Sequence, residues 1–113
     1  MQVEYCATGA LSPALLAQVL ALCEAAYEEP IAPYLADIGD GMHALGRVEG
    51  QLVTHALLVE RTLQLSGRPA MRTAYVELVA TEPSEQGRGY ASALLRDLAT
   101  QLDDYDLGAL SPS

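Results

Sequence analysis

A glycine-bearing segment at residues 86–91, Gln-Gly-Arg-Gly-Tyr-Ala, holds the residue types best suited to chemistry. It follows an apolar stretch and precedes a segment whose leucines recur at helical spacing. The first amides of a helix lack partners within the helix and carry partial positive charge, so a phosphate group binds well there. Gly87 and Gly89 allow a ligand to approach the backbone closely, and Arg88 can add a charge-assisted contact. The segment therefore indicates a phosphate-binding loop.

This loop is neither a dinucleotide-binding fingerprint nor a P-loop. Its glycine spacing is different, and no lysine followed by serine or threonine comes after it. The alternative is an ordinary connection between a strand and a helix, in which the glycines only allow the chain to turn. On the residues of the loop alone, both interpretations stay open.

Glu77 is the second residue of chemical interest, because it lies in an otherwise apolar strand expected over residues 73–81. A carboxylate in such a strand is costly to bury unless it has partners or a function. The alternative is that Glu77 faces solvent, or that it pairs with Arg61 or Arg72.

Other polar residues permit weaker predictions. Glu28 and Glu29 precede a short helix, where they could attract a cationic ligand or form a solvated acidic loop. His43 and His55 lie in expected strands without the spacing of metal ligands, so structural roles are favoured and no metal is expected. Cys23 falls on a helical apolar stripe and is predicted to be a buried thiol.

The composition narrows the class of protein. The chain has 113 residues, half of them hydrophobic, which suits one folded domain over residues 1–113. Its formal charge of −9 repels nucleic acid and anionic membranes, so neither is an expected partner. No signal peptide and no apolar stretch long enough to span a bilayer is visible, so the expected location is the cytoplasm.

The elements that must position these residues are read from periodicity, turns and breakers. Strands are expected at residues 2–7, 42–48, 52–61, 73–81 and 107–110. Helices are expected from Pro13, from Pro33 to Asp37, and from Arg88 to Asp103. The three middle strands form a meander, and the last strand can return parallel to its predecessor by a right-handed crossover. The sequence therefore predicts an α/β (α+β) fold with a mixed sheet, in the order β-α-α-β-β-β-α-β.

The segment Gln86–Ala91 resembles the pyrophosphate loop of the GNAT superfamily of N-acetyltransferases, which reads Gln or Arg, two residues, Gly, one residue, then Gly or Ala. The expected element order also resembles that fold. The resemblance implies acetyl-CoA as the cosubstrate and a backbone at Val79 and Thr81 that pairs with its pantetheine arm and orients the acetyl group. The residues implied to hold the pyrophosphate are Gln86, Gly87, Arg88, Gly89, Tyr90 and Ala91.

A narrower resemblance covers residues 41–111. The segments 41–45, 55–56, 75–77 and 107–111, together with Arg61, are similar to aminoglycoside 2′-N-acetyltransferases and their uncharacterised relatives. It implies transfer of acetyl from acetyl-CoA to a primary amine, with an aminoglycoside as the narrower expectation. It also implies that Glu77 is the catalytic base, acting through water. Glu28 and Glu29 fall in the superfamily's acceptor-binding region.

The chain departs from the superfamily pattern at its C-terminus. The superfamily continues past the fifth strand with a helix and usually two more strands, and that helix commonly supplies a tyrosine as general acid. Tyr105 precedes the last strand and does not match that position. We therefore expect a partial GNAT domain, truncated after the fifth strand, and the sequence leaves open whether it is an active enzyme. The alternative is a non-catalytic module that binds CoA or forms a homodimer through the exposed edge of its last strand.

Overall fold

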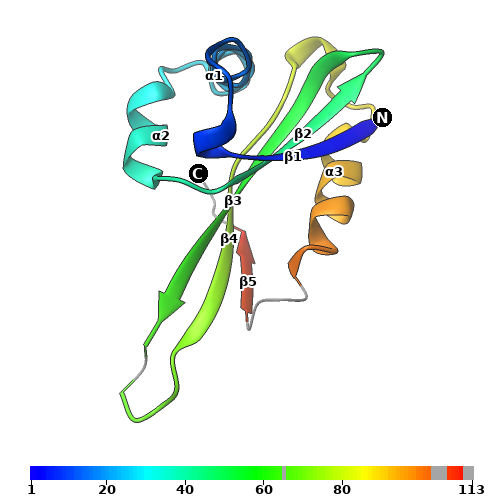
Figure 1. Ribbon diagram of the computed structural model, residues 1–113. Coiled ribbons are helices and arrows are strands. Elements are labelled where there is room, and N and C mark those ends of the chain that lie inside the picture. Colours follow the sequence, from blue (N-terminus) through cyan, green and yellow to red (C-terminus); the bar gives the residue numbers. More distant parts are fainter. Residues whose placement is uncertain (65, 103–106, 111–113) are drawn as a thin grey trace.

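The computed structural model describes residues 1–64, 66–102 and 107–110, so Asp103, Tyr105 and Ser111–Ser113 lie outside the described residues. Figure 1 shows the arrangement of the elements. They are β1 (Gln2–Ala7), α1 (Pro13–Tyr27), α2 (Ala32–Ile38), β2 (Met42–Val48), β3 (Gln51–Leu63), β4 (Met71–Thr81), α3 (Tyr90–Ala99) and β5 (Leu107–Leu110). Short 3-10 helices cover Thr8–Ala10 and Pro83–Glu85. The predicted order of strands and helices is confirmed.

The strands form one mixed sheet in the order β1-β2-β3-β4-β5. Strands β1 to β4 pair antiparallel with one another in that order, and β5 runs parallel to β4. The largely apolar β3 lies at the centre of the sheet, as its sequence predicts for a strand buried on both faces. The predicted fold class is therefore confirmed.

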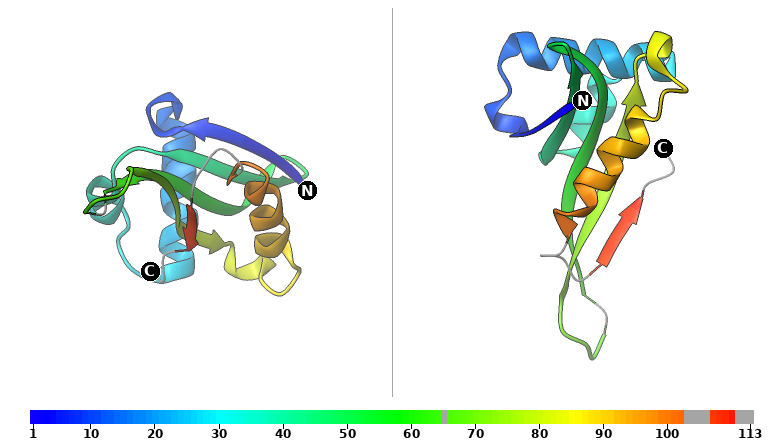
Figure 2. Two further views of the ribbon diagram at one scale, coloured as in Figure 1. Left: turned by 90° about the horizontal axis from the view of Figure 1, so that it is seen from below. Right: turned by 90° about the vertical axis from the view of Figure 1, so that its right-hand side faces the viewer.

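The sheet separates two hydrophobic cores, because α1 and α2 cover one face and α3 covers the other (Figure 2). Cys23 is fully buried in the first core, as predicted. The buried residues of the first core include Val19, Cys23, Ile31, Leu45, Leu57, Val59, Leu78 and Ala80. Those of the second include Ala44, Ala56, Leu58, Ala74, Val76, Leu94 and Leu98.

Helix α1 begins where the sequence places a capping residue. The Ser12 hydroxyl accepts a hydrogen bond from the Leu15 amide at 3.1 Å, and Pro13 occupies the first turn. Such a cap supplies an acceptor for one of the amides that a helix start leaves unpaired, and it stabilises the helix by about 1 kcal/mol. The helix ends at Glu28, which adopts a left-handed conformation with φ of 59°.

Several predicted boundaries are wrong, including the end of the α3 helix, which lies at Ala99 rather than at Asp103. Strands β3 and β4 pair as far as Leu63 and Met71, beyond the predicted ends, and their hairpin projects past the helices (Figure 1). The α3 helix begins at Tyr90 rather than at Arg88, because Gly89 has φ of 82° and so lies in left-handed rather than helical geometry.

Strand β4 contains a bulge at Leu78. Leu57 pairs with Glu77 and His55 pairs with Ala80, so two residues of β4 lie opposite the single residue Ala56. The extra residue is Leu78, whose φ of 50° is unusual for a residue with a side chain. Cross-strand partners share a face, so Glu77, opposite the core residue Leu57, points to the α1 and α2 face, where Leu78 also packs. The bulge therefore places two consecutive side chains on one face.

Candidate functional site

The loop between β4 and α3 keeps its backbone open at both glycines. Gly87 and Gly89 have φ values of 84° and 82°, and a Cβ built at either position would meet nothing within 4 Å. Side chains other than glycine, asparagine or aspartate rarely adopt this geometry. The glycines thus serve the turn and also leave space for a ligand, so both interpretations of the loop are compatible with its backbone.

The amides at the start of α3 bear on the phosphate-binding interpretation. The first backbone hydrogen bond of the helix runs from the Ala93 amide to the Gly89 carbonyl at 3.0 Å. Within residues 1–64, 66–102 and 107–110, no protein acceptor faces the amides of Gly87 through Ser92. All of these residues except Arg88 border a hollow of about 280 Å³, which is lined by Thr81, Glu85, Gln86, Gly87, Gly89, Tyr90, Ala91 and Ser92. A row of unpaired amides at a helix start favours an anion.

The charged side chains of the loop are less well placed for an anion than its backbone. Arg88 is largely exposed and lies 3.4 Å from the Glu85 carboxylate, measured from Nε to Oε2. Glu85 lines the same hollow as the amides. Gln86 turns its side-chain amide to the Thr81 carbonyl at 3.2 Å. A phosphate at the loop would therefore compete with Glu85 for Arg88.

Strand β4 leads from this loop along a partly open edge of the sheet. Within the described residues, strand β5 pairs with β4 from Thr73 to Val76. Beyond Val76, the only strand that pairs with β4 in the described part of the chain is β3. The Val79 carbonyl accepts a hydrogen bond from the Tyr27 hydroxyl at 2.8 Å, and the Thr81 carbonyl accepts the one from Gln86. Backbone pairing with a ligand at these residues would use an N–H or a second lone pair.

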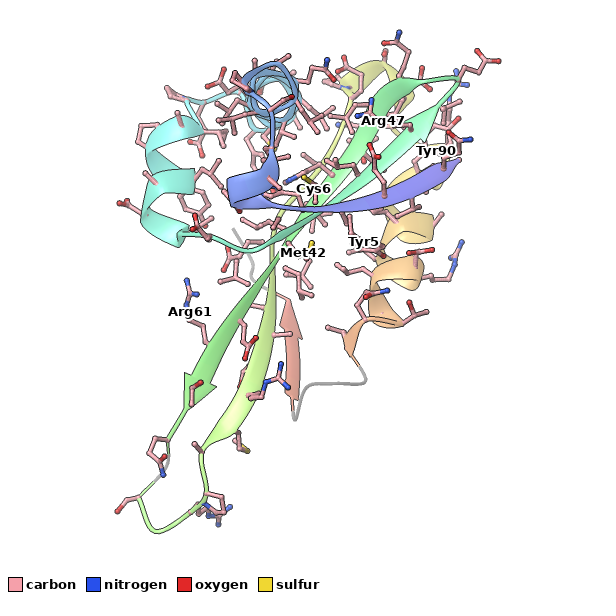
Figure 3. The ribbon with its side chains drawn as sticks, viewed as in Figure 1. Tyr5, Cys6, Met42, Arg47, Arg61 and Tyr90 are labelled. Carbon is pink, nitrogen blue, oxygen red and sulfur yellow. The ribbon has the colours of Figure 1, made fainter. Side chains whose placement is uncertain are left out.

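Glu77 lies at the other end of this edge, in a hollow of about 390 Å³ lined by Val59, Arg61, Thr62, Tyr75 and Glu77. The Tyr34 hydroxyl donates a hydrogen bond to Glu77 Oε2 at 3.4 Å. Arg61 extends from β3 toward the end of α2 and donates to the Ile38 carbonyl at 2.6 Å (Figure 3). Arg72 forms an ion pair with Glu60 at 2.9 Å. The Glu77 carboxylate is therefore half-buried beside a pocket rather than directed into bulk solvent.

The chain matches a known family of proteins. The family model described as an acetyltransferase (GNAT) domain matches residues 10–113. The chain belongs to the GNAT acetyltransferase family. The resemblance read from the loop and the element order is thereby confirmed.

Relatives of this GNAT chain include aminoglycoside acetyltransferases. Aminoglycoside 2′-N-acetyltransferase of Mycolicibacterium fortuitum is 42% identical over 74 residues, which are 65% of this chain and only 37% of that relative. Ribosomal-protein-alanine N-acetyltransferase from Brucella melitensis biovar Abortus 2308 superposes over 100% of this chain and 81% of its own, with a TM-score of 0.72 at 18% identity. An aminoglycoside N-acetyltransferase solved in complex with CoA covers 99% of this chain and 78% of its own, with a TM-score of 0.68 at 17% identity. The two solved structures show a shared fold.

The acidic residues predicted to attract an acceptor are separated in this GNAT chain. Glu29 borders a hollow of about 120 Å³ that is also lined by Tyr27, Ile31, Tyr34 and Leu78. Glu28 is exposed and ends α1. Tyr34 touches both regions, because it lines this hollow and also donates to Glu77. Tyr34 therefore connects the hollow beside Glu29 to the Glu77 carboxylate.

The two histidines, for which the sequence favoured structural roles, form a buried pair. His43 Nδ1 lies 2.8 Å from His55 Nε2, and both side chains are fully buried. Burial lowers the pKa of His43. Burial also lowers the pKa of His55 to about 4, with a smaller contribution from His43, while the bond to the Leu78 carbonyl opposes the shift. Their spacing along the chain gave no sign of the contact, because it depends on the register of β2 with β3.

The lowered pKa of His55 predicts a loss of stability in acid. The unfolded state takes up a proton near pH 6.5 and the folded state only near pH 4, so stability is complete above pH 6.5 and falls as the pH drops toward 4. Between pH 7 and pH 5 the His55 contribution to the unfolding free energy should fall by about 2 kcal/mol. Urea unfolding at both pH values measures it. The loss should be smaller in His55→Asn, and an equal loss in the variant would contradict the assignment.

In the described part of this GNAT chain, no group of three or more His, Cys, Asp or Glu side chains is placed to hold a metal ion. None of the described helices has the length and apolar character needed to cross a bilayer.

Proposed function

We propose that this chain binds acetyl-CoA and transfers its acetyl group to a primary amine. The observation that carries the proposal is the row of amides from Gly87 to Ser92, which border an open hollow and find no acceptor in the described part of the protein. A pyrophosphate offers several acceptor oxygens and negative charge, both of which such amides favour. A relative of the same fold was solved in complex with CoA.

The edge of β4 connects the proposed pyrophosphate site to Glu77. With the pyrophosphate at the loop, the pantetheine arm would follow the backbone from Thr81 to Val79, and the thioester would come to lie near the bulge. An extended arm adding to an open strand edge is a common mode of recognition, in which backbone hydrogen bonds provide affinity. This placement makes use of the part of β4 that β5 does not cover.

Acetyl transfer requires a neutral amine and a proton acceptor. In the proposed reaction Glu77, directly or through a water, takes the proton that the amine loses. The amine nitrogen forms a bond to the acetyl carbon, the bond from that carbon to sulfur breaks, and the departing CoA thiolate takes up a proton. The half-buried position of Glu77 beside a pocket supports its role as the base, because an acceptor amine has room to approach it.

We propose an aminoglycoside as the acceptor class. Such molecules carry several amines that are cationic at neutral pH, and the chain has a net charge of −9. Glu29 and Tyr34 line a hollow next to Glu77, where a carboxylate and an aromatic ring can hold an ammonium group. The Mycolicibacterium fortuitum relative acts on aminoglycosides, as its name states. A role for Glu28 stays a prediction.

Titration calorimetry with acetyl-CoA, followed by a thiol-release screen of amines, tests this function. We expect binding, and we expect free thiol to appear with aminoglycosides but not with acetyl-CoA alone. Binding without thiol release from any amine would instead support a non-catalytic CoA-binding domain. If neither acetyl-CoA nor CoA binds, the proposed function is wrong.

Removing the Glu85 charge should tighten acetyl-CoA binding. Glu85 lines the hollow at the loop amides and holds Arg88, so Glu85→Gln removes a repulsive carboxylate and releases a guanidinium. For a half-exposed site we expect a gain of about 2- to 5-fold in affinity by calorimetry. Glu82→Gln is the control, because Glu82 faces a hollow beside α1 instead. The gain should shrink with added salt, and equal effects of the two variants would contradict it.

Three further features stay predictions. They are a single domain over residues 1–113, a cytoplasmic location, and a homodimer through β5. Strand β5 is the last strand in the sheet order, so a second copy could pair with its outer edge. Sedimentation at several concentrations measures the oligomeric state.

A further inference from the structure

A buried chain of hydrogen bonds, which we call the histidine chain, runs under the β4 bulge through Thr8, His43 and His55. The Gly41 amide donates to Thr8 Oγ1 at 2.9 Å, and Thr8 Oγ1 lies 3.0 Å from His43 Nε2. His43 Nδ1 lies 2.8 Å from His55 Nε2. His55 Nδ1 lies 2.9 Å from the Leu78 carbonyl oxygen. The histidine chain thus links the backbone at the start of β2 to the bulge.

The acceptor at the end of the histidine chain determines where every hydrogen lies. A carbonyl can only accept, so His55 Nδ1 must carry a hydrogen and donate it to Leu78. A neutral His55 then accepts at Nε2 from His43 Nδ1–H, which leaves His43 Nε2 as an acceptor. The Thr8 hydroxyl hydrogen has two acceptors within reach, His43 Nε2 at 3.0 Å and the Gly41 carbonyl at 3.2 Å, and the shorter contact assigns it to His43. All bonds therefore point the same way, with both rings in the neutral Nδ1–H form. The lowered pKa values of the two histidines keep this neutral state at physiological pH.

The bond from His55 fixes the orientation of one peptide unit. In a trans peptide the C=O and N–H groups point in opposite directions, so an anchored Leu78 carbonyl turns the Val79 N–H away from His55. Leu78 has φ of 50°, a conformation that costs a non-glycine residue free energy unless its surroundings hold it. Without His55 the carbonyl would also be left buried without that donor, at a further cost. His55 is therefore placed to stabilise the bulge in this one conformation.

The Leu78–Val79 peptide unit is next to one group that the proposed function uses and contains another. Glu77 precedes it and Val79 belongs to it, and the Tyr27 hydroxyl holds the next carbonyl, that of Val79, at 2.8 Å. The bulge is thus held by two side-chain donors, one from β3 and one from α1. A rotation of the Leu78–Val79 peptide would move the Val79 N–H relative to the Glu77 carboxylate.

We propose that His55 is a positioning residue for acetyl transfer, which orients the Leu78–Val79 peptide so that its N–H faces the carbonyl of the bound acetyl group. This inference rests on the proposed function, because it assigns the acetyl group to the bulge. His55 touches neither cosubstrate nor acceptor in this role. His43 and Thr8 act one step further away, by holding His55 in the donating form.

The test compares His55→Asn with His55→Gln, two amides of different reach. The Asn amide nitrogen lies close to the position of imidazole Nδ1, so it can still donate to Leu78. The Gln amide lies close to Nε2, so it keeps the contact with His43 and loses the one to Leu78. Calorimetry with acetyl-CoA and with CoA provides the readout, since only acetyl-CoA has the carbonyl. We expect His55→Gln to lower the ratio of acetyl-CoA to CoA affinity by about 10-fold, and His55→Asn to restore most of it.

Each outcome decides one of the two proposals. If both His55 variants weaken the two ligands equally, His55 is only structural and the inference is wrong, while the proposed function stands. If the unaltered protein binds neither ligand, the proposed function fails and the positioning role fails with it. Nitrogen-15 NMR of the unaltered protein is a second measurement that needs no variant. It should show both histidines as neutral Nδ1–H rings, and an Nε2–H form of His55 would overturn the inference.

Discussion

Replacing Gly87 by Asp is expected to weaken acetyl-CoA binding by about 100-fold. A Cβ at this position meets no protein atom within 4 Å, so the new carboxylate fits without a steric clash. It would lie beside the unpaired amides of Gly87 through Ser92 and would repel a pyrophosphate there. Asp tolerates the left-handed conformation better than most residues, so the φ of 84° costs little stability. Calorimetry with acetyl-CoA measures the effect.

Gly67→Asp is the matched control for this variant. Gly67 has φ of 75°, a Cβ there also meets nothing within 4 Å, and it lies in the β3–β4 hairpin far along the chain from the loop. The two substitutions therefore add the same charge and a similar backbone cost at different places. If Gly67→Asp weakens acetyl-CoA binding as much as Gly87→Asp, the loop is not the pyrophosphate site.

Glu77→Gln is expected to lower kcat by roughly 100- to 10,000-fold, the range that a general base usually contributes. The amide is close in shape to the carboxylate and its oxygen can still accept from the Tyr34 hydroxyl, so the pocket should keep its form. The amide cannot take the proton of the amine, so turnover falls while the affinity for acetyl-CoA stays unchanged. Thiol release at saturating amine measures kcat, and calorimetry measures binding.

Glu60→Gln separates the loss of a base from the loss of a charge. Glu60 lies on β3, forms an ion pair with Arg72 and is exposed, and it does not line the Glu77 hollow. Both variants remove one negative charge, but Glu60 pairs with Ala74 and so lies on the α3 face of the sheet, opposite to the face that Glu77 occupies. Unchanged turnover in Glu77→Gln, or an equal fall in Glu60→Gln, would remove Glu77 from the mechanism.

The strand bounds were the part of the fold most accessible to prediction. Strands β1 and β2 match their predicted bounds, and the Glu49-Gly50 turn closes the second. The start of α3 was missed, since whether Gly89 joins a helix depends on its φ and not on its neighbours' periodicity. The loop itself was located correctly from its glycines, and its role as a pyrophosphate site stays a prediction.

The bulge and the histidine chain could not be predicted from local sequence. Nothing in the residues around Leu78 signals a positive φ, because the conformation is supported from elsewhere by His55 on β3 and Tyr27 on α1. Likewise, His43 and His55 meet only through the register of two strands. The proposed role of Glu77 depends on tertiary structure in the same way, since the pairing of Glu77 with Leu57 places its side chain on the α1 and α2 face.

The two cores on either side of the sheet have a consequence for how this protein can change. Val19 on α1 belongs to one buried cluster and Leu98 on α3 belongs to the other, and the sheet lies between the two clusters. Substitutions on opposite sides should then have additive effects on the unfolding free energy. Under the proposed function, substitutions in the α1 and α2 layer would alter the proposed acceptor site, while the α3 layer, which begins at the proposed pyrophosphate loop, would stay unchanged. Acceptor specificity and cosubstrate affinity would then change independently.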